Sequence, residues 1–253
     1  NPATLQKALD KGAADTVTTS MEEAVKDADI VVSAVPVEAM ESVFTEMAPF
    51  LKSDAVVTDV GSTRQTVIAA ARKGLGDKFH QYAPAHPIAG GEMPGVDYAS
   101  ADLFDEKVVI STPDEGMDPK VVTFIEEAWR KAGARVQAMS PLQHDLTFAS
   151  VSHLPHVLAY ALVDMIAREE NAQEKLKMAG AGFRDFTRIA SSSPVMWRDI
   201  CLSNREALSH ELERYRASLD TLQKYIDESD GKALESVFEN AVRNRRGLVF
   251  PGK

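Results

Sequence analysis

Short β-branched runs alternate with helical stretches through the first half of the chain, and this alternation constrains the fold more than any other feature. The segment Ile30-Val31-Val32 has the length and composition of a buried strand, whereas the stretches between such runs repeat apolar residues at helical spacing. Strands separated by helices predict a parallel, doubly wound sheet. The predicted strands are 30–35, 55–60, 80–83, 108–111 and 135–138, and the predicted helices are 3–10, 21–26, 38–50, 64–73 and 119–132.

The pattern changes near Met139, where β-branched runs stop and apolar residues recur only at helical spacing. Pro141 suits the first turn of a helix, and residues 193–227 predict one long helix with a single break. We therefore divide the chain into an α/β domain, residues 1–138, and an all-α domain, residues 139–253. So small a helical domain encloses little core of its own, which predicts a homodimer built through it.

The first residues predict a helix and no strand. Asn1 is a good helix cap, Pro2 is a good first helical residue, and no Gly-x-Gly-x-x-Gly sequence precedes Asp29. We expect the first strand-helix-strand unit of the nucleotide fold to be missing. Since helix-terminus amides of that unit hold a dinucleotide pyrophosphate, the printed chain is expected to bind a cofactor weakly.

Charge and composition exclude several classes of protein. The net charge of −10 provides no basic surface for DNA or RNA, so we expect no nucleic-acid partner. No uninterrupted apolar run approaches the ~20 residues of a membrane span, and we expect no membrane association. The lone Cys201 cannot form an internal disulfide, which favours the cytoplasm.

Two loops at predicted strand ends carry the strongest candidates for chemistry. The sequence Asp59-Val60-Gly61-Ser62 and the sequence that begins at His86 each follow a predicted strand, and ligands of such sheets bind beyond the carboxyl ends of strands. We expect the Ser62 hydroxyl to lie near the His86 imidazole, where the two groups can handle a substrate proton. The alternatives are that Ser62 caps the next helix and that His86 is a loop residue fixed by Pro87.

A second cluster, Ser152-His153-Leu154-Pro155-His156, lies near the start of a predicted helix. Two histidines three residues apart share a helix face, but no third ligand or cysteine accompanies them, so a metal site is not expected. Binding of an anion or substrate is the favoured interpretation. The alternative is that Ser152 caps the helix while one histidine packs against the first domain.

Two further groups depend on charged side chains. Arg188 can clamp a carboxylate with two parallel hydrogen bonds, or it can pair with Asp185 or Asp199. His144 and Asp145 are adjacent in sequence, so we expect no direct contact between their side chains and predict a hinge or interdomain role for the pair.

Taken together, these motifs resemble the prephenate and arogenate dehydrogenase family of tyrosine biosynthesis. Four blocks keep the family's order and spacing over about 140 residues. They are 59–62, 86–90, 152–156 and 182–190, with Met196-Trp197-Arg198-Asp199 after them.

The resemblance implies a Rossmann domain, a helical dimerisation domain, and the oxidative decarboxylation of prephenate or arogenate with NAD or NADP. It implies that His86 accepts the hydrogen bond of the ring hydroxyl and that Ser62 orients it. Arg188 would bind a substrate carboxylate, assisted by His156 and His153. The cofactor would lie along two segments, Ala34, Val35 and Pro36 in the first, and Asp59, Gly61 and Ser62 in the second.

Two other functions stay open on sequence alone. Another hydroxyacid dehydrogenase of similar plan would be expected to use a lysine in the helical domain, and no lysine falls in the matching blocks. A non-catalytic dimeric remnant would bind no cofactor. The sequence separates neither NAD from NADP nor prephenate from arogenate.

Overall fold

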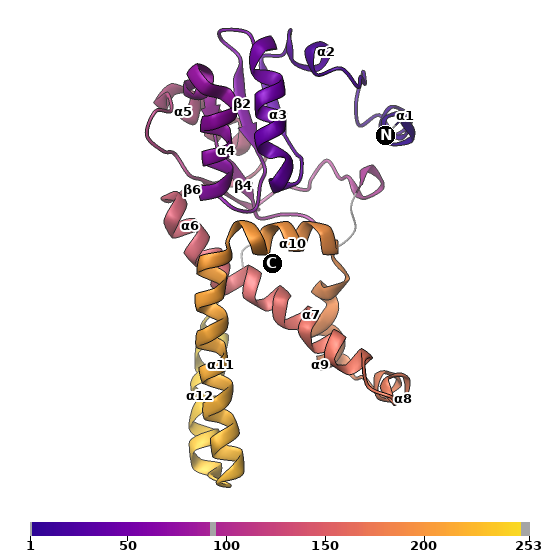
Figure 1. The fold of residues 1–253 in the computed structure, drawn as a ribbon, viewed down its shortest axis with the longest axis vertical. Coiled ribbons are helices and arrows are strands. Elements are labelled where there is room, and N and C mark those ends of the chain that lie inside the picture. The colour runs from indigo at the N-terminus through magenta and orange to yellow at the C-terminus, as the bar shows by residue number, and fades with distance from the viewer. Residues whose placement is uncertain (1, 92–94, 249–253) are drawn as a thin grey trace.

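The computed structural model describes residues 2–91 and 95–248 and has two parts, which follow one another along the chain (Figure 1). The first part carries all six strands of the described residues, and the second part is helical. This is the predicted architecture of an α/β domain followed by an all-α domain.

Six strands form two three-stranded sheets. The order in the first sheet is β1-β2-β3, with parallel pairing throughout, and in the second it is β4-β5-β6. β5 and β6 are parallel, but β4 and β5 are antiparallel. The strands are β1 (Ile30–Ser33), β2 (Val56–Asp59), β3 (Tyr82–Ala83), β4 (Ala85–Pro87), β5 (Val108–Ser111) and β6 (Arg135–Ala138).

The helices of the first part match the predicted positions within a few residues. They are α1 (Pro2–Asp10), α2 (Met21–Val25), α3 (Met40–Met47), α4 (Gln65–Leu75) and α5 (Pro119–Lys131), with the short 3-10 segments η1 (Val37–Ala39), η2 (Ala48–Phe50), η3 (Gly76–Gln81) and η4 (Val96–Tyr98). Two differences concern the sheet. The sequence predicts no strand at β4, which has three residues and includes a proline, and the antiparallel β4–β5 pair departs from the all-parallel prediction.

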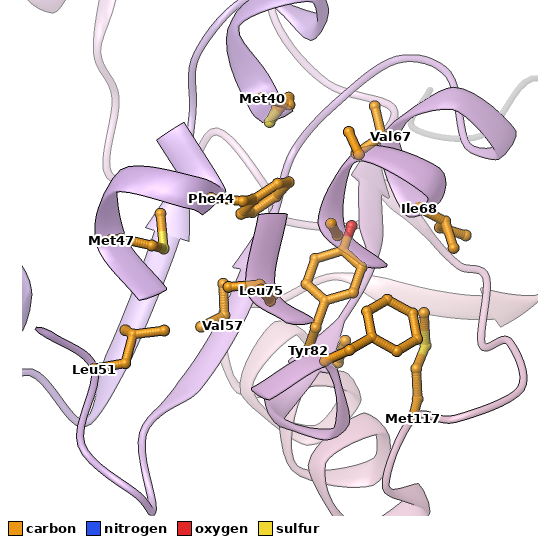
Figure 2. Close-up of a cluster of buried hydrophobic side chains, with 14 of the residues drawn as sticks. Met40, Phe44, Met47, Leu51, Val57, Val67, Ile68, Leu75, Tyr82 and Met117 are labelled. Carbon is orange, nitrogen blue, oxygen red and sulfur yellow. The ribbon is translucent and has the colours of Figure 1, made fainter. Parts of the chain in front are cut away.

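The main core lies in this first part and packs α3 and α4 against β2 and β3 (Figure 2). Met40, Phe44 and Met47 repeat at helical spacing and are almost fully buried, which explains why this stretch forms a helix here. Gly74 permits the close approach of α4 to α3, because a Cβ atom there would lie 2.6 Å from the Phe44 Cβ. The rigid core thereby fixes where β2 ends and α4 begins.

The second part begins with a helix that runs without a break from Pro141 to Ala167. Ser140 caps it by accepting a hydrogen bond from the Gln143 amide, and Pro141 occupies the first turn as predicted. The helix consists of α6 (Pro141–Phe148), the π-helical turn η5 (Ala149–His153) and α7 (Leu154–Ala167). Ser152 lies inside this helix, so the prediction that it caps a helix start is wrong.

The remaining helices complete the second part (Figure 1). They are α8 (Ala172–Lys177), α9 (Ala181–Thr187), the 3-10 turn η6 (Arg188–Ser191), α10 (Pro194–Ser203), α11 (Arg205–Asp227) and α12 (Gly231–Gly247). The single break predicted within 193–227 is confirmed and falls at Asn204. α10 lies against η1 of the first part, and α11 and α12 form an antiparallel hairpin.

The helical part leaves much apolar surface exposed. Among the described residues, Pro141–Ala167 is the one helix of sufficient length and mean hydropathy (27 residues, 1.4) to cross a membrane, and 17% of its most apolar window is buried. Val151 is 66% exposed and Leu202 is 61% exposed. Apolar surface of this extent marks an interaction site.

Candidate functional site

The predicted ligand loops leave neighbouring strands at the same edge. β1 and β2 are parallel and in register, with Ser33 opposite Asp59, so the loops that follow them start side by side. In the first loop Ala34 and Pro36 are exposed and Val35 is partly buried. This edge therefore offers backbone and small apolar groups to a ligand.

The second loop is held from beneath by a buried ion pair. Arg64 and Asp59 both have 0% side-chain exposure, and the Arg64 Nη2 lies 2.6 Å from the Asp59 Oδ1. The same carboxylate accepts hydrogen bonds from the Gly61 amide at 2.7 Å and the Tyr82 hydroxyl at 2.5 Å. Both oxygens of Asp59 are thus engaged inside the protein, so Asp59 shapes the loop and does not offer its carboxylate to a cofactor.

Gly61 is required by this arrangement. A Cβ atom at Gly61 would lie 2.8 Å from the Arg64 Nη2 and 2.9 Å from the Asp59 Oδ1. Any larger residue would push the ion pair apart. Packing against the Asp59–Arg64 pair thus explains why the residue before Ser62 is a glycine.

Ser62 is partly buried, and its hydroxyl has no hydrogen-bond partner among the described residues. The alternative that Ser62 caps the next helix is wrong, because α4 begins at Gln65 and a carboxylate from the second part caps it. The Asp145 Oδ1 accepts from the Arg64 amide at 2.8 Å, and the Asp145 Oδ2 accepts from the Gln65 amide at 2.9 Å. The Ser62 hydroxyl is therefore available to a ligand.

His86 lies in β4, opposite Ile110 of β5, and is partly buried. The Arg64 Nη1 donates a hydrogen bond to the Ala85 carbonyl at 3.2 Å, which joins the loop after β2 to the strand that carries His86. The two predicted loops thus meet, although no hydrogen bond joins Ser62 to His86 within the described part of the chain. Burial lowers the pKa of His86 well below its usual value, and His144, Arg64 and His153 lower it further.

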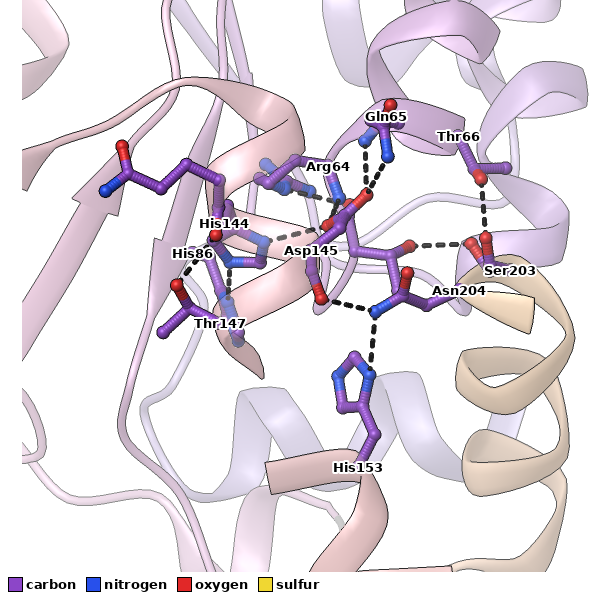
Figure 3. Close-up of polar contacts among 12 residues, drawn as sticks. Arg64, Gln65, Thr66, His86, His144, Asp145, Thr147, His153, Ser203 and Asn204 are labelled. Carbon is purple, nitrogen blue, oxygen red and sulfur yellow. Dashed lines mark hydrogen bonds and ion pairs between the residues drawn. The ribbon is translucent and has the colours of Figure 1, made fainter. Parts of the chain in front are cut away.

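His144 and Asp145 contact each other, so the prediction of no direct contact is wrong. The His144 Nδ1 lies 2.9 Å from the Asp145 Oδ1, and the His144 Nε2 lies 2.7 Å from the His86 Nδ1 (Figure 3). Side chains of adjacent helical residues diverge in an exposed helix, but here both are pinned by partners from the first part. Asp145 does connect the two parts, as predicted, since it caps α4.

His153 and His156 occupy different surroundings. His153 is 1% exposed, and its Nδ1 lies 3.1 Å from the Asn204 Nδ2. Burial lowers the pKa of His153 to about 4. Asp145 raises this pKa by a smaller amount, and His144 and His156 lower it. His156 donates from Nδ1 to the Ser152 carbonyl at 2.9 Å and stacks on Trp197, with ring centroids 3.6 Å apart.

Arg188 lies at the start of η6 and is exposed. η6 packs against α7, the helix that carries His156. Asp199, one of the two alternative partners of Arg188, is engaged by Arg198, whose Nη2 lies 2.6 Å away. The structure thus places the predicted arginine on the element next to the histidine-bearing helix.

Sequence reasoning missed two residues that organise this site, Arg64 and Asn204, and it did not foresee that His144 contacts both Asp145 and His86. The Asn204 Nδ2 donates to the Asp145 carbonyl at 2.8 Å, so Asn204 ties the break between α10 and α11 to the helix start at Pro141. The one signal in the sequence was that Asn204, a polar residue, falls within the stretch 193–227 for which a broken helix is predicted. No pattern in the sequence pairs it with Asp145, which is 59 positions away.

The fold and site together define a class: an α/β nucleotide-binding domain and a helical domain that share a histidine-containing site, as in nicotinamide-dependent oxidoreductases. The model of the prephenate dehydrogenase nucleotide-binding domain matches residues 1–138, and the model of the prephenate dehydrogenase dimerization domain matches residues 140–240. The chain belongs to the prephenate dehydrogenase family, which confirms the resemblance inferred from its motifs.

Individual relatives agree with this family. The chain is 38% identical to the cyclohexadienyl dehydrogenase of Zymomonas mobilis, over 96% of the chain and 82% of that protein. Its structure is similar to prephenate dehydrogenase from A. aeolicus in complex with hydroxyphenyl propionate and NAD+, with a TM-score of 0.89, 36% identity, and coverage of 97% of this chain and 86% of the other. It is also similar to Synechocystis arogenate dehydrogenase, with a TM-score of 0.80, 25% identity, and coverage of 98% and 89%.

Proposed function

We propose that this chain catalyses the oxidative decarboxylation of prephenate or arogenate, with transfer of a hydride to NAD or NADP. The observation that carries the proposal is a partly buried, neutral histidine, His86, beside the edge where Ser62 and the loop after β1 project. The family match and the relatives named for these substrates support it. The parallel strand ends and the exposed loop residues suit a dinucleotide.

The chemistry requires little from the protein beyond orientation and one proton acceptor. When bound, the nicotinamide supplies the hydride acceptor for the ring carbon that bears the hydroxyl. His86 accepts the hydrogen bond of that hydroxyl, a role that a neutral imidazole performs near pH 7. Loss of carbon dioxide makes the ring aromatic, so the decarboxylation itself needs little assistance.

The other site residues fix the substrate and cofactor. Ser62 orients the hydroxyl, and Arg188 binds a carboxylate with two charge-assisted hydrogen bonds. His156 assists Arg188 on the helical side, whereas the predicted substrate contact of His153 is not retained, because the His153 side chain is 1% exposed and hydrogen-bonded to Asn204. The cofactor lies along Ala34, Val35 and Pro36 and along the backbone of Gly61 and Ser62, while Asp59 holds that second loop in place.

The active form is a homodimer joined through the helical domain, residues 139–253, with residues 1–138 as the nucleotide domain. The exposed apolar side chains of α7, α11 and α12 and the match to a dimerization domain support this assembly. Sedimentation of the full-length protein should give twice the mass of one chain. We place the enzyme in the cytoplasm on the basis of its one free cysteine, and we propose no nucleic-acid partner because the net charge is −10. We assign the exposed apolar face of Pro141–Ala167 to the dimer and not to a membrane, since the dimerization-domain match includes this helix.

A steady-state assay tests the function directly. The full-length protein is mixed with prephenate or arogenate and with NAD or NADP, in all four combinations, and the absorbance of the reduced nicotinamide is followed. We expect turnover with at least one combination and loss of most of it in His86→Asn. Absence of turnover in all four combinations would exclude the proposed reaction.

A further inference from the structure

Three side chains form a continuous hydrogen-bonded line that begins at the proposed proton acceptor (Figure 3). The His86 Nδ1 lies 2.7 Å from the His144 Nε2, and the His144 Nδ1 lies 2.9 Å from the Asp145 Oδ1. His144 is 0% exposed and Asp145 is 1% exposed. His86 comes from the nucleotide domain, whereas the other two come from the helical domain.

The carboxylate at the far end of this line fixes the direction of every hydrogen bond in it. Burial raises the pKa of Asp145, but hydrogen bonds from His144 and from the Gln65 and Arg64 amides outweigh it, and the pKa is lowered overall. Asp145 is therefore ionised at pH 7 and only accepts hydrogen bonds. The His144 Nδ1 must consequently carry a proton and donate it to Asp145.

The next step follows from the neutrality of His144. Burial lowers the pKa of His144, and this outweighs the opposing effect of the Asp145 carboxylate. A neutral imidazole with a proton on Nδ1 has a lone pair on Nε2. The His86 Nδ1 lies 2.7 Å from the His144 Nε2, so the His86 Nδ1 must donate the hydrogen bond that this lone pair accepts.

We propose that His144 and Asp145 are positioning residues that hold His86 in its Nδ1-protonated tautomer, with a bare Nε2 that receives the substrate hydroxyl. The role in catalysis rests on the proposed function, whereas the tautomer is a property of the free protein. Neither His144 nor Asp145 touches the substrate in this proposal. Phe148 stacks on the His144 ring at 4.4 Å between centroids and lies 5.0 Å from the His86 ring, which fixes both ring planes.

The proton balance of the reaction requires such a reversible acceptor. As the hydride leaves the ring carbon, the O–H bond breaks, its electron pair forms the carbonyl, and the proton moves to the His86 Nε2. When carbon dioxide leaves, the electron pair of the broken carbon–carbon bond enters the ring, and the oxygen takes the proton back. The transient His86 cation keeps its Nδ1 hydrogen bond to His144, and the Asp145 carboxylate stabilises it through that ring.

The line also depends on the docking of the two domains. Asp145 caps α4 of the nucleotide domain through the Arg64 and Gln65 amides, and Asn204 holds the Asp145 carbonyl. The other charged or titratable groups that act on His86 are Arg64 and His153. The competent tautomer is therefore assembled only when the helical domain sits on the end of α4.

Nitrogen-15 NMR of the histidine rings in the full-length protein tests the proposal without substrate. Long-range proton–nitrogen spectra report which ring nitrogen carries hydrogen, and His86→Asn assigns the signals. For wild type at pH 7 we expect a protonated Nδ1 and a bare Nε2 at His86. A protonated Nε2 at His86, or a mixture of both tautomers, would overturn the proposal.

Kinetics of matched variants test the consequence. His144→Leu removes the acceptor, and we expect the proton of His86 to move to Nε2 and kcat to fall on the order of 10²–10³-fold, with KM changed less than about threefold. His144→Gln places an amide oxygen near the same point and should restore part of kcat. The control His210→Leu removes an exposed histidine of α11 and should change neither readout.

The outcomes separate this proposal from the proposed function. A protonated Nδ1 in wild type without turnover of either substrate would overturn the function and leave the tautomer established. Turnover with a protonated Nε2 would overturn the tautomer alone. If His144→Leu fails to fold, the wild-type spectrum and the kcat of His144→Gln still decide the matter.

Discussion

The buried Asp59–Arg64 pair offers a stringent test of how the site is held together, through the substitution Arg64→Met. Both side chains have 0% exposure, and Arg64 also donates to the Thr63 and Ala85 carbonyls at 2.8 and 3.2 Å. Removing one partner of a buried pair leaves an uncompensated charge and costs about 3–5 kcal/mol. We expect Arg64→Met to lower the free energy of unfolding by that amount.

The double variant Asp59→Asn with Arg64→Met gives the coupling between the two groups. With both charges removed, no buried charge is left unpaired, so the double variant should be less destabilised than the sum of the single variants by about 1–3 kcal/mol. Urea unfolding followed by circular dichroism gives the midpoint and slope for each protein. Arg130→Met serves as a control, since Arg130 pairs with Glu126 on the surface of α5 at 49% exposure and should cost less than about 1 kcal/mol.

Two results would refute this reasoning. One is an Arg64→Met protein as stable as the Arg130→Met control. The other is strict additivity of the two single changes, since groups that share one buried network are expected to couple. Either result would mean that the loop carrying Gly61 and Ser62 is held by something other than this pair.

Three further predictions concern the site. His86→Asn should lower kcat on the order of 10²–10⁴-fold. In the wild type, kcat/KM should stay level above about pH 6.5 and fall in acid, because the reactive neutral imidazole is lost only below the lowered pKa of His86. An unchanged kcat in His86→Asn, or a wild-type kcat/KM that falls only above about pH 7, would contradict the assignment. Arg188→Ala should mainly raise KM, with a loss of about 2–5 kcal/mol of substrate binding free energy, because the bound carboxylate excludes water from the contact, and Arg188→Lys should recover part of that binding. Equal KM values for wild type and Arg188→Ala would contradict the role. His153 is neutral and buried with a pKa of about 4, so its contribution to the free energy of unfolding is complete above about pH 6.5 and is lost as the pH falls toward 4, by about 3 kcal/mol in total. The urea midpoint should therefore fall less between about pH 6.5 and about pH 4 in His153→Gln than in the wild type, and an equal fall in both proteins would contradict the burial argument.

Much of the fold follows from local sequence patterns. The alternation of β-branched runs and helical stretches located five of the six strands and the helices of the first part, because those segments bury one face or both faces against a single core. The strand at His86 escaped because its three residues include a proline and carry no periodicity. Its antiparallel pairing with β5 is a long-range property that no local pattern encodes.

The site was less predictable than the fold. Motif order and the family resemblance were sufficient to select His86, Ser62 and Arg188, although the structure places His86 in the strand β4 and Arg188 in the 3-10 turn η6 and not in loops. The partners of His86 were not foreseen, since their contact depends on how one domain sits on the helix end of the other. Asp59 was expected to face a cofactor, and only its full burial reveals that its oxygens are engaged by Arg64, Tyr82 and Gly61.

The most direct test of the whole account is a crystal structure of the full-length protein with NAD and hydroxyphenyl propionate, the pair of ligands described for the A. aeolicus relative. We predict that the His86 Nε2 and the Ser62 hydroxyl lie within hydrogen-bond distance of the phenolic oxygen, and that Arg188 contacts the carboxylate in the same pocket. An analogue bound away from His86, or an Arg188 that reaches that pocket in neither subunit of the dimer, would contradict the account.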